Sequence, residues 1–186
     1  QTVDDAVGEA YDKVARMLGL GYPGGPPLDR LAVQGSGQAV AFPRPVLKPG
    51  AKQSRRRVPL ERRPLDMSFS GLKTAVRVHL QSENACASAD VAASFQEAVV
   101  DVLTDRVMRA VGETGIRRVA VGGGVAANSR LRERLGELPI ELTLPPPSRC
   151  TDNGSMIAHV GRLRMLRGQR DPMDLSARAH WVPGAR

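Results

Sequence analysis

The sequence predicts an α/β domain, because apolar runs typical of strands and amphipathic helical patterns occur in alternation. In the later part of the chain, short apolar runs typical of strands alternate with amphipathic helical segments. The run at 118–121 leads through three glycines into a helical pattern, and a second run follows at 140–144. Because the helix predicted at the start of the chain has no strand before it, we interpret residues 1–186 as a single incomplete domain.

Composition places the chain among globular proteins. It is 41% hydrophobic and 25% charged, and no apolar run approaches the ~20 residues of a membrane span. The polar, acidic first residues do not resemble a signal peptide. Since residue 1 is not Met, we expect a chain that is processed, trimmed or part of a longer reading frame. Two cysteines without metal-type spacing favour a reduced, cytoplasmic protein, and a single disulfide between them is the alternative. We expect no membrane partner.

Basic side chains are concentrated in one segment. The formal net charge is +8, and residues 44–63 hold eight of the 27 Lys and Arg and one of the 19 Asp and Glu, which makes that segment +7 (8 − 1). We predict a basic surface loop over 44–66. Solvation alone explains such a loop; the alternative is contact with RNA phosphates, which would make binding depend on salt.

Helical periodicity and turn residues define the expected elements of the first part. Apolar residues at helical spacing from Val3 to Met17 predict a helix with Thr2 as its N-cap. A rigid turn over 22–27, a short helix over 28–33, a strand over 40–42, a strand over 66–69 and a helix over 72–80 follow.

The remaining elements are predicted in the same way. They are a long amphipathic helix from Val91 to near Gly112, strands over 118–121 and 140–144, helices over 129–138 and 154–166, and a short extended piece near 175–180. Asn128 stands where it would cap the helix that begins at Ser129.

Two segments have the context of a nucleotide or metal site. Gly122–Gly124 follows a strand and precedes a helix, where glycines allow close approach of a ligand and a helix N-terminus favours anions; a tight packing turn explains them equally well. Asp152 precedes the last helix. Alone it reads as an N-terminal cap, and the alternative is a carboxylate that binds a metal or polarises a water.

Two further acids, Asp12 and Asp29, lie near the Pro-Gly-Gly turn. They read either as surface acids or as a carboxylate pair that accepts hydrogen bonds from sugar hydroxyls. The G-x-G-x-x-G letters at 19–24 follow a helix and run into prolines, so we reject a dinucleotide loop there. The three histidines have no metal-ligand spacing.

Six blocks in order resemble the TsaD family, the tRNA N6-adenosine threonylcarbamoyltransferases once labelled O-sialoglycoprotein endopeptidases. They are Asp4–Lys13, Tyr22–Pro26, Phe42–Pro45, Ser68–Ala75, Gly122–Asn128 and Cys150–Ala158. The resemblance covers nearly the whole chain. It implies the actin-like, sugar-kinase-like ATPase fold, of which this chain would be the C-terminal lobe with its returning C-terminal helix.

The resemblance also implies chemistry and partners. A threonylcarbamoyl group would pass from threonylcarbamoyl-AMP to N6 of the adenosine beside the anticodon of tRNA. Asp12, Gly25, Asp29 and Asn128 would line the adenylate pocket, and Asp152 would bind one divalent metal ion, Fe2+ or Zn2+. The expected partners are tRNA, the adenylate, an inactive paralogue and a small ATPase. The residues suggest no general base.

The sequence departs from the family in two ways. The upstream H-x-x-x-H metal pair and the Ser-Gly-Gly-His-type phosphate loop of the family's N-terminal half are not in it. We therefore expect this polypeptide to be inactive alone and the metal to take further ligands from that half. The Arg55–Arg57 run lengthens the basic loop. The alternatives are a non-catalytic nucleotide-binding regulatory module and, less well supported, a metalloendopeptidase.

Overall fold

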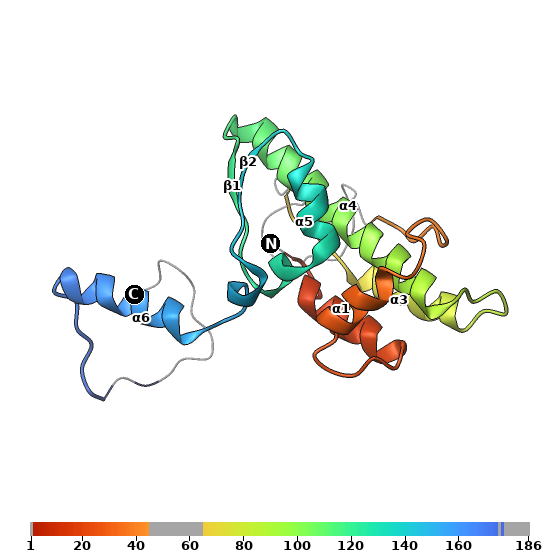
Figure 1. The fold of residues 1–186 in the computed structure, drawn as a ribbon, viewed down its shortest axis with the longest axis horizontal. Coiled ribbons are helices and arrows are strands. Elements are labelled where there is room, and N and C mark those ends of the chain that lie inside the picture. The colour runs from red at the N-terminus through yellow and green to blue at the C-terminus, as the bar shows by residue number, and fades with distance from the viewer. Residues whose placement is uncertain (1, 45–64, 175, 177–186) are drawn as a thin grey trace. The chain divides into compact units, whose positions relative to one another are not determined.

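The structure is a computed structural model that describes residues 2–44, 65–174 and 176 (Figure 1). The chain divides into two compact units, Gln1–Thr151 and Asp152–Arg186. Helices and two parallel strands make up the described part of the first unit, in agreement with a mixed α/β class. Residues 45–64 of the predicted basic loop and the extended piece predicted near 175–180, apart from Ser176, lie outside the described residues.

Helix α4, Ser88–Thr114, is the longest element of the first unit. Its 27 residues span about 40 Å at 1.5 Å per residue. The predicted stripe of Val91, Phe95, Ala98 and Val102 is buried, which confirms the amphipathic pattern. The helix continues past Gly112 and ends where Gly115 adopts a φ of 70°, a left-handed conformation that glycine takes without strain.

Three shorter helices build the main hydrophobic core with α4. They are α1, Val7–Met17, α2, Gly25–Ala32, and α3, Ser70–Leu80. Helices α2 and α3 contact α4, and α1 contacts both α2 and α3. The ring of Tyr11 meets that of Phe95 edge to face, with centroids 5.2 Å apart. This core fixes the positions of α1 and α2, which carry two of the predicted site acids.

The N-terminal segment does not form the predicted helix start. Helix α1 begins at Val7, and Thr2 instead pairs with Met67 in an isolated parallel bridge, so the predicted Thr2 cap is wrong. Asp4 accepts hydrogen bonds from the backbone N–H of Phe69 and the hydroxyl of Ser70 at the start of α3. These partners lie more than 60 residues away in sequence, beyond the reach of a local pattern.

The segment between α1 and α3 differs from expectation in three places. Residues 25–27, predicted as part of a rigid turn, are the first turn of α2, where prolines are tolerated because no intrahelical N–H bond is needed. Residues 40–42 form no strand; the N–H of Val40 donates to Ser94 Oγ at 3.0 Å instead. The predicted strand at 66–69 is reduced to the bridge at Met67, and Asp66 is buried rather than part of a surface loop.

Two strands and the helix between them follow the predicted order. Strands β1, Arg118–Ala120, and β2, Glu141–Thr143, pair in parallel with Val119 opposite Leu142. The chain between them forms η2, Gly124–Ala127, and α5, Ser129–Gly136, which is two residues shorter than predicted. Leu131 and Leu135 of α5 pack with Val100 of α4 in a second apolar cluster. Helix α5 is thereby held beside α4 (Figure 1).

The second unit, in its described part, consists of α6, Gly154–Leu166, and the turn after it. The bounds of α6 agree with the prediction. Met156, Ile157 and Val160 are exposed on it, and none of its side chains is buried. Between the start of α1 and residue 174, excepting the 45–64 gap, the structure has no helix that is both long and apolar enough to cross a membrane.

Candidate functional site

Asp12 and the start of α2 form the first part of the candidate site. Asp12 Oδ1 accepts the backbone N–H of Gly24 at 2.7 Å, which ties α1 to the residue before α2. A Cβ on Gly24 would lie 2.4 Å from Ala15 Cβ and 2.9 Å from Asp12 Cα, so only glycine fits there. Gly25, by contrast, has open space around its Cα, which leaves its backbone approachable.

Asp29 forms the second part, one turn further along α2. Gly25 and Asp29 are four residues apart and therefore share a face of the helix. Asp29 Oδ1 accepts from Asn128 Nδ2 at 3.0 Å and from Ser129 Oγ at 2.8 Å, and Oδ2 accepts the N–H of Ser129 at 3.1 Å. A carboxylate has about four acceptor positions, so these three bonds leave room on Oδ2 for a ligand hydroxyl.

Asn128 stands at the end of the glycine turn and begins α5. Its Oδ1 accepts the N–H of Leu131 at 2.9 Å, which confirms the predicted cap. The turn before it needs glycine at position 123, where φ is 86°. The structure thus brings together all four residues predicted for the adenylate pocket: Asp12, Gly25, Asp29 and Asn128.

Two participants in this cluster are absent from the sequence prediction. Ser129 supplies two of the three donors to Asp29. Gln96, on α4, accepts the second Nδ2 hydrogen of Asn128 at 2.8 Å and is 4% exposed. A signal for Gln96 exists in the sequence: its neighbours three and four residues away on the helix are all apolar, namely Ala92, Ala93, Val99 and Val100. A polar side chain in such a position is buried and needs a partner.

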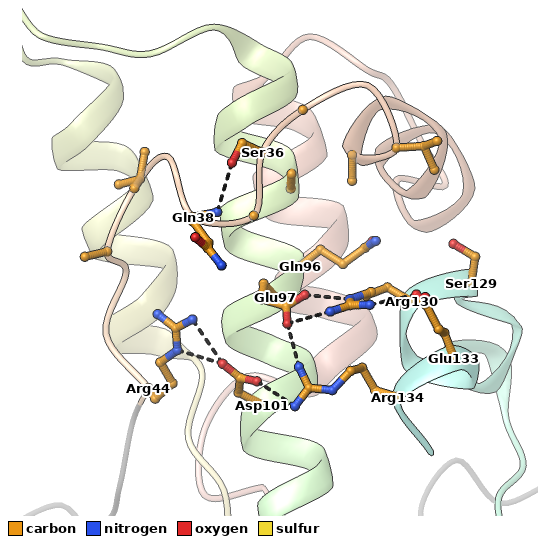
Figure 2. A pocket seen from close by; sticks show the side chains of 17 residues that line it. Ser36, Gln38, Arg44, Gln96, Glu97, Asp101, Ser129, Arg130, Glu133 and Arg134 are labelled. Atoms are coloured by element: carbon orange, nitrogen blue, oxygen red, sulfur yellow. Dashed lines mark hydrogen bonds and ion pairs between the residues drawn. The ribbon is translucent and has the colours of Figure 1, made fainter. Parts of the chain in front are cut away.

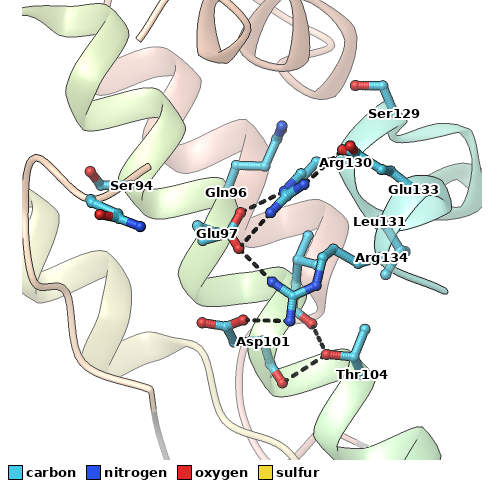
Figure 3. Close-up of polar contacts among 12 residues, drawn as sticks. Ser94, Gln96, Glu97, Asp101, Thr104, Ser129, Arg130, Leu131, Glu133 and Arg134 are labelled. Carbon is cyan, nitrogen blue, oxygen red and sulfur yellow. Dashed lines mark hydrogen bonds and ion pairs between the residues drawn. The ribbon is translucent and has the colours of Figure 1, made fainter. Parts of the chain in front are cut away.

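A groove of about 930 Å³ adjoins this cluster, between α4, α5 and residues 32–44 (Figure 2). Six charged side chains alternate in sign along it and are joined by ion pairs: Arg44, Asp101, Arg134, Glu97, Arg130 and Glu133. Arg130 contacts both oxygens of Glu97, at 2.7 and 3.0 Å. The chain of pairs connects α5 to α4 and so holds the helix that Asn128 begins (Figure 3).

The ion pairs change the electrostatics of the neighbourhood. The hydrogen bond from Arg130, reinforced by the charges of Arg130 and Arg134, lowers the pKa of Glu97 despite its partial burial. Burial raises the pKa of Tyr11 far above its usual range, and the charges of Asp29 and Glu97 add to that effect. Tyr11 therefore stays neutral beside the site at any physiological pH.

Acid is expected to weaken this arrangement. A carboxyl whose pKa is lower in the folded state contributes stability above its unfolded pKa, and that contribution is lost as the pH falls through the folded value. Glu97, Asp4 and Asp5 all have lowered pKa values. The free energy of unfolding from urea titrations should therefore fall between about pH 5 and pH 2. In Glu97→Gln the free energy of unfolding should fall less steeply with pH than in the wild type; equal slopes would show that Glu97 does not contribute to the acid sensitivity.

Asp152 lies in the second unit, so its position relative to the four other site residues is not described. It is exposed, and the N-cap of α6 is Asn153, whose Oδ1 accepts the N–H of Met156 at 3.1 Å. The capping role considered for Asp152 thus belongs to its neighbour. Within the described ranges no three His, Cys, Asp or Glu side chains gather to hold a metal ion. Asp152 therefore fits a metal ion as one carboxylate ligand only.

The fold and the cluster together define a class: an α/β domain with carboxylates and a helix-capping amide grouped beside a glycine turn, as in nucleotide sites. The sequence profile of one family, described as tRNA N6-adenosine threonylcarbamoyltransferase, matches residues 1–159. The chain belongs to this family, TsaD. Membership implies the actin-like, sugar-kinase-like ATPase fold.

Two curated relatives carry the same description. The protein from Magnetococcus marinus is 49% identical over 91% of this chain and 47% of its own length. The protein from Syntrophotalea carbinolica is 43% identical over 97% of this chain and 52% of its own length. Both are described as tRNA N6-adenosine threonylcarbamoyltransferases. The chain spans about half the length of these relatives.

Proposed function

We propose that this chain forms the adenylate-binding part of a tRNA N6-adenosine threonylcarbamoyltransferase. The observation that supports this most directly is the convergence of Asp12, Gly25, Asp29 and Asn128 around α2, in a chain that belongs to this family. The reaction would move a threonylcarbamoyl group from threonylcarbamoyl-AMP to N6 of the adenosine beside the anticodon. The adenylate leaves as AMP when the tRNA amine attacks the carbamoyl carbon.

Each residue of the cluster has a role suited to its chemistry. Asp12 and Asp29 accept hydrogen bonds from the ribose hydroxyls, for which the second oxygen of Asp29 retains acceptor capacity. The open backbone at Gly25 allows the sugar to approach α2 closely. Asn128 lies on the adenosine side, held rigid by its cap on α5. These contacts bind and orient the adenylate, and they contain no general base.

A divalent metal ion, Fe2+ or Zn2+, completes the proposal. Asp152 would supply one carboxylate ligand, and further ligands would come from the part of the relatives' length that this chain does not span. When bound, the ion would supply Lewis-acid polarisation of the carbamoyl carbonyl or the mixed-anhydride phosphate. We expect this chain to be inactive alone and to act in the cytoplasm with tRNA, an inactive paralogue and a small ATPase.

The metal assignment is tested by replacing Asp152 with Asn in the whole protein that contains this chain. Helix α6 should persist because Asn153 is its cap, whereas bound iron and zinc should fall about tenfold or more, since first ligands matter at least as much as the groups that orient them. Transfer of labelled threonylcarbamoyl to tRNA should fall with metal content. Asp171→Asn removes an exposed acid that pairs with Arg164 and serves as the control. Unchanged metal content in Asp152→Asn would refute the assignment.

A further inference from the structure

Gln96 is one of the buried polar residues of α4 that the proposed reaction does not use directly. It is 4% exposed and surrounded along the helix by apolar neighbours. Its Oε1 accepts a hydrogen bond from Asn128 Nδ2, 2.8 Å away and 32 residues along the chain. A long polar side chain in such a place loses rotamer freedom and hydration on folding. Its hydrogen bond with Asn128 indicates that Gln96 orients the Asn128 amide.

The hydrogen bonds of Asn128 leave one orientation for its amide. The Oδ1 atom faces the N–H of Leu131, and the two Nδ2 hydrogens face Asp29 and Gln96, both of which present acceptor oxygens. A flipped amide would set an oxygen against those two acceptors and an NH2 group against the Leu131 N–H. Gln96 is the neutral member of this pair of acceptors, since Asp29 is a carboxylate.

We infer that Gln96 is a positioning residue of the adenylate pocket: it fixes the amide of Asn128 so that Asp29 and the α5 cap are held in one geometry. The expected effect on AMP binding rests on the proposed nucleotide site, whereas the hydrogen bond between Gln96 and Asn128 does not. Without the Gln96 acceptor, one buried Nδ2 hydrogen loses its partner, and Asn128 can satisfy it only by turning away from Asp29. Asp29 would then be held by Ser129 alone.

A buried side chain on the same helix provides a matched control. Ser94 is fully buried, accepts the N–H of Val40 at 3.0 Å and donates to the carbonyl of Ser36 at 3.1 Å. It therefore ties α4 to another segment, as Gln96 does, and neither of these hydrogen bonds involves a residue of the Asn128 cluster. Ser94→Ala should lower the midpoint of urea unfolding, because it removes two buried hydrogen bonds, and should leave the side-chain amide signals of Asn128 unchanged.

The experiment compares Gln96→Met, which keeps the volume of the side chain and removes its acceptor, with Ser94→Ala and the wild-type chain. In 15N-labelled protein the Nδ2 hydrogens of Asn128 should shift and exchange faster with solvent in Gln96→Met only, and the Leu131 amide, which Asn128 Oδ1 caps, should lose protection with them. The dissociation constant for AMP should rise about tenfold in Gln96→Met and less than twofold in Ser94→Ala.

The two readouts separate this inference from the proposed function. If the wild-type chain binds no AMP, the proposed function fails for this chain, and the Asn128 signals still decide the role of Gln96. If the Nδ2 signals of Asn128 are the same in Gln96→Met as in the wild type, or if Ser94→Ala moves them equally, Gln96 does not position Asn128. If the signals change and AMP affinity stays at the wild-type value, the positioning role in the pocket is refuted.

Discussion

Replacing Gly24 with Ala is expected to destabilise the first unit by about 3 kcal/mol, the upper part of the range for overpacking a core. The new methyl group would lie 2.4 Å from the Cβ of Ala15 and 2.9 Å from the Cα of Asp12. Both neighbours belong to α1, a helix fixed by the core, so α2 must move away from α1. The 2.7 Å bond between the Gly24 N–H and Asp12 is then lost as well.

Gly25→Ala is the matched comparison for this prediction. A Cβ at Gly25 meets nothing within 4 Å, so the free energy of unfolding should change by about 0.5 kcal/mol or less. Urea titration followed by circular dichroism measures both variants. The proposed function adds that Gly25→Ala, although folded, should bind AMP more weakly because its methyl group occupies the space nearest the ligand. Equal stability of Gly24→Ala and the wild type would refute the close contact between α1 and α2.

Asn128→Asp is the second substitution with a large expected effect. An aspartate can still accept the Leu131 N–H and cap α5, but its other oxygen would face Asp29 where the Nδ2 donor now lies at 3.0 Å. Two carboxylates at that separation cannot both remain ionised without cost, so one binds a proton at higher pH than usual. We expect a loss of about 2–4 kcal/mol at pH 7, with AMP binding abolished.

Asn128→Ser separates repulsion from the loss of hydrogen bonds. Serine also caps a helix but brings no charge, so its cost should be about 1–2 kcal/mol and nearly independent of pH. The difference in free energy of unfolding between Asn128→Asp and Asn128→Ser should be largest at pH 7. It should shrink as the pH falls toward 4, where one carboxyl of the Asp pair is protonated. A gap that is constant from pH 7 to pH 4 would show that Asp29 does not face residue 128.

Elements determined by local patterns are predicted well from the sequence. The bounds of α6 and the Asn128 cap of α5 follow from residues within a few positions of each other. The structure at the start of the chain does not follow from local sequence, because Thr2 pairs with Met67 and Asp4 accepts a hydrogen bond from Phe69. The 40–42 segment is likewise held by Ser94 rather than by a neighbouring strand. Long-range partners of this kind leave no periodic trace in the sequence.

Some residues of the candidate site can likewise be predicted from the sequence, and others are revealed only by long-range contacts in the fold. Asp12, Gly25 and Asn128 lie within the ordered motifs, Asp29 follows the Pro-Gly-Gly turn, and the structure groups all four around α2. Gln96 and Ser129 lie outside those motifs as single residues, and only the folded contact between α4 and α5 reveals what they hold. Asp152 illustrates the opposite case, since the structure gives its suspected capping role to Asn153.

Titration of the 15N-labelled wild-type chain with AMP, followed by amide chemical shifts, shows whether the cluster around α2 binds the adenylate. We expect saturable shifts centred on Gly25, Asp29, Asn128 and Ser129, which Asp29→Asn should weaken. Inorganic phosphate at the same concentration should not reproduce them, because the proposed contacts are to the nucleoside. Absence of saturable shifts at these residues, or saturable shifts confined to the charged groove between α4 and α5, would contradict the claim that this cluster binds the adenylate.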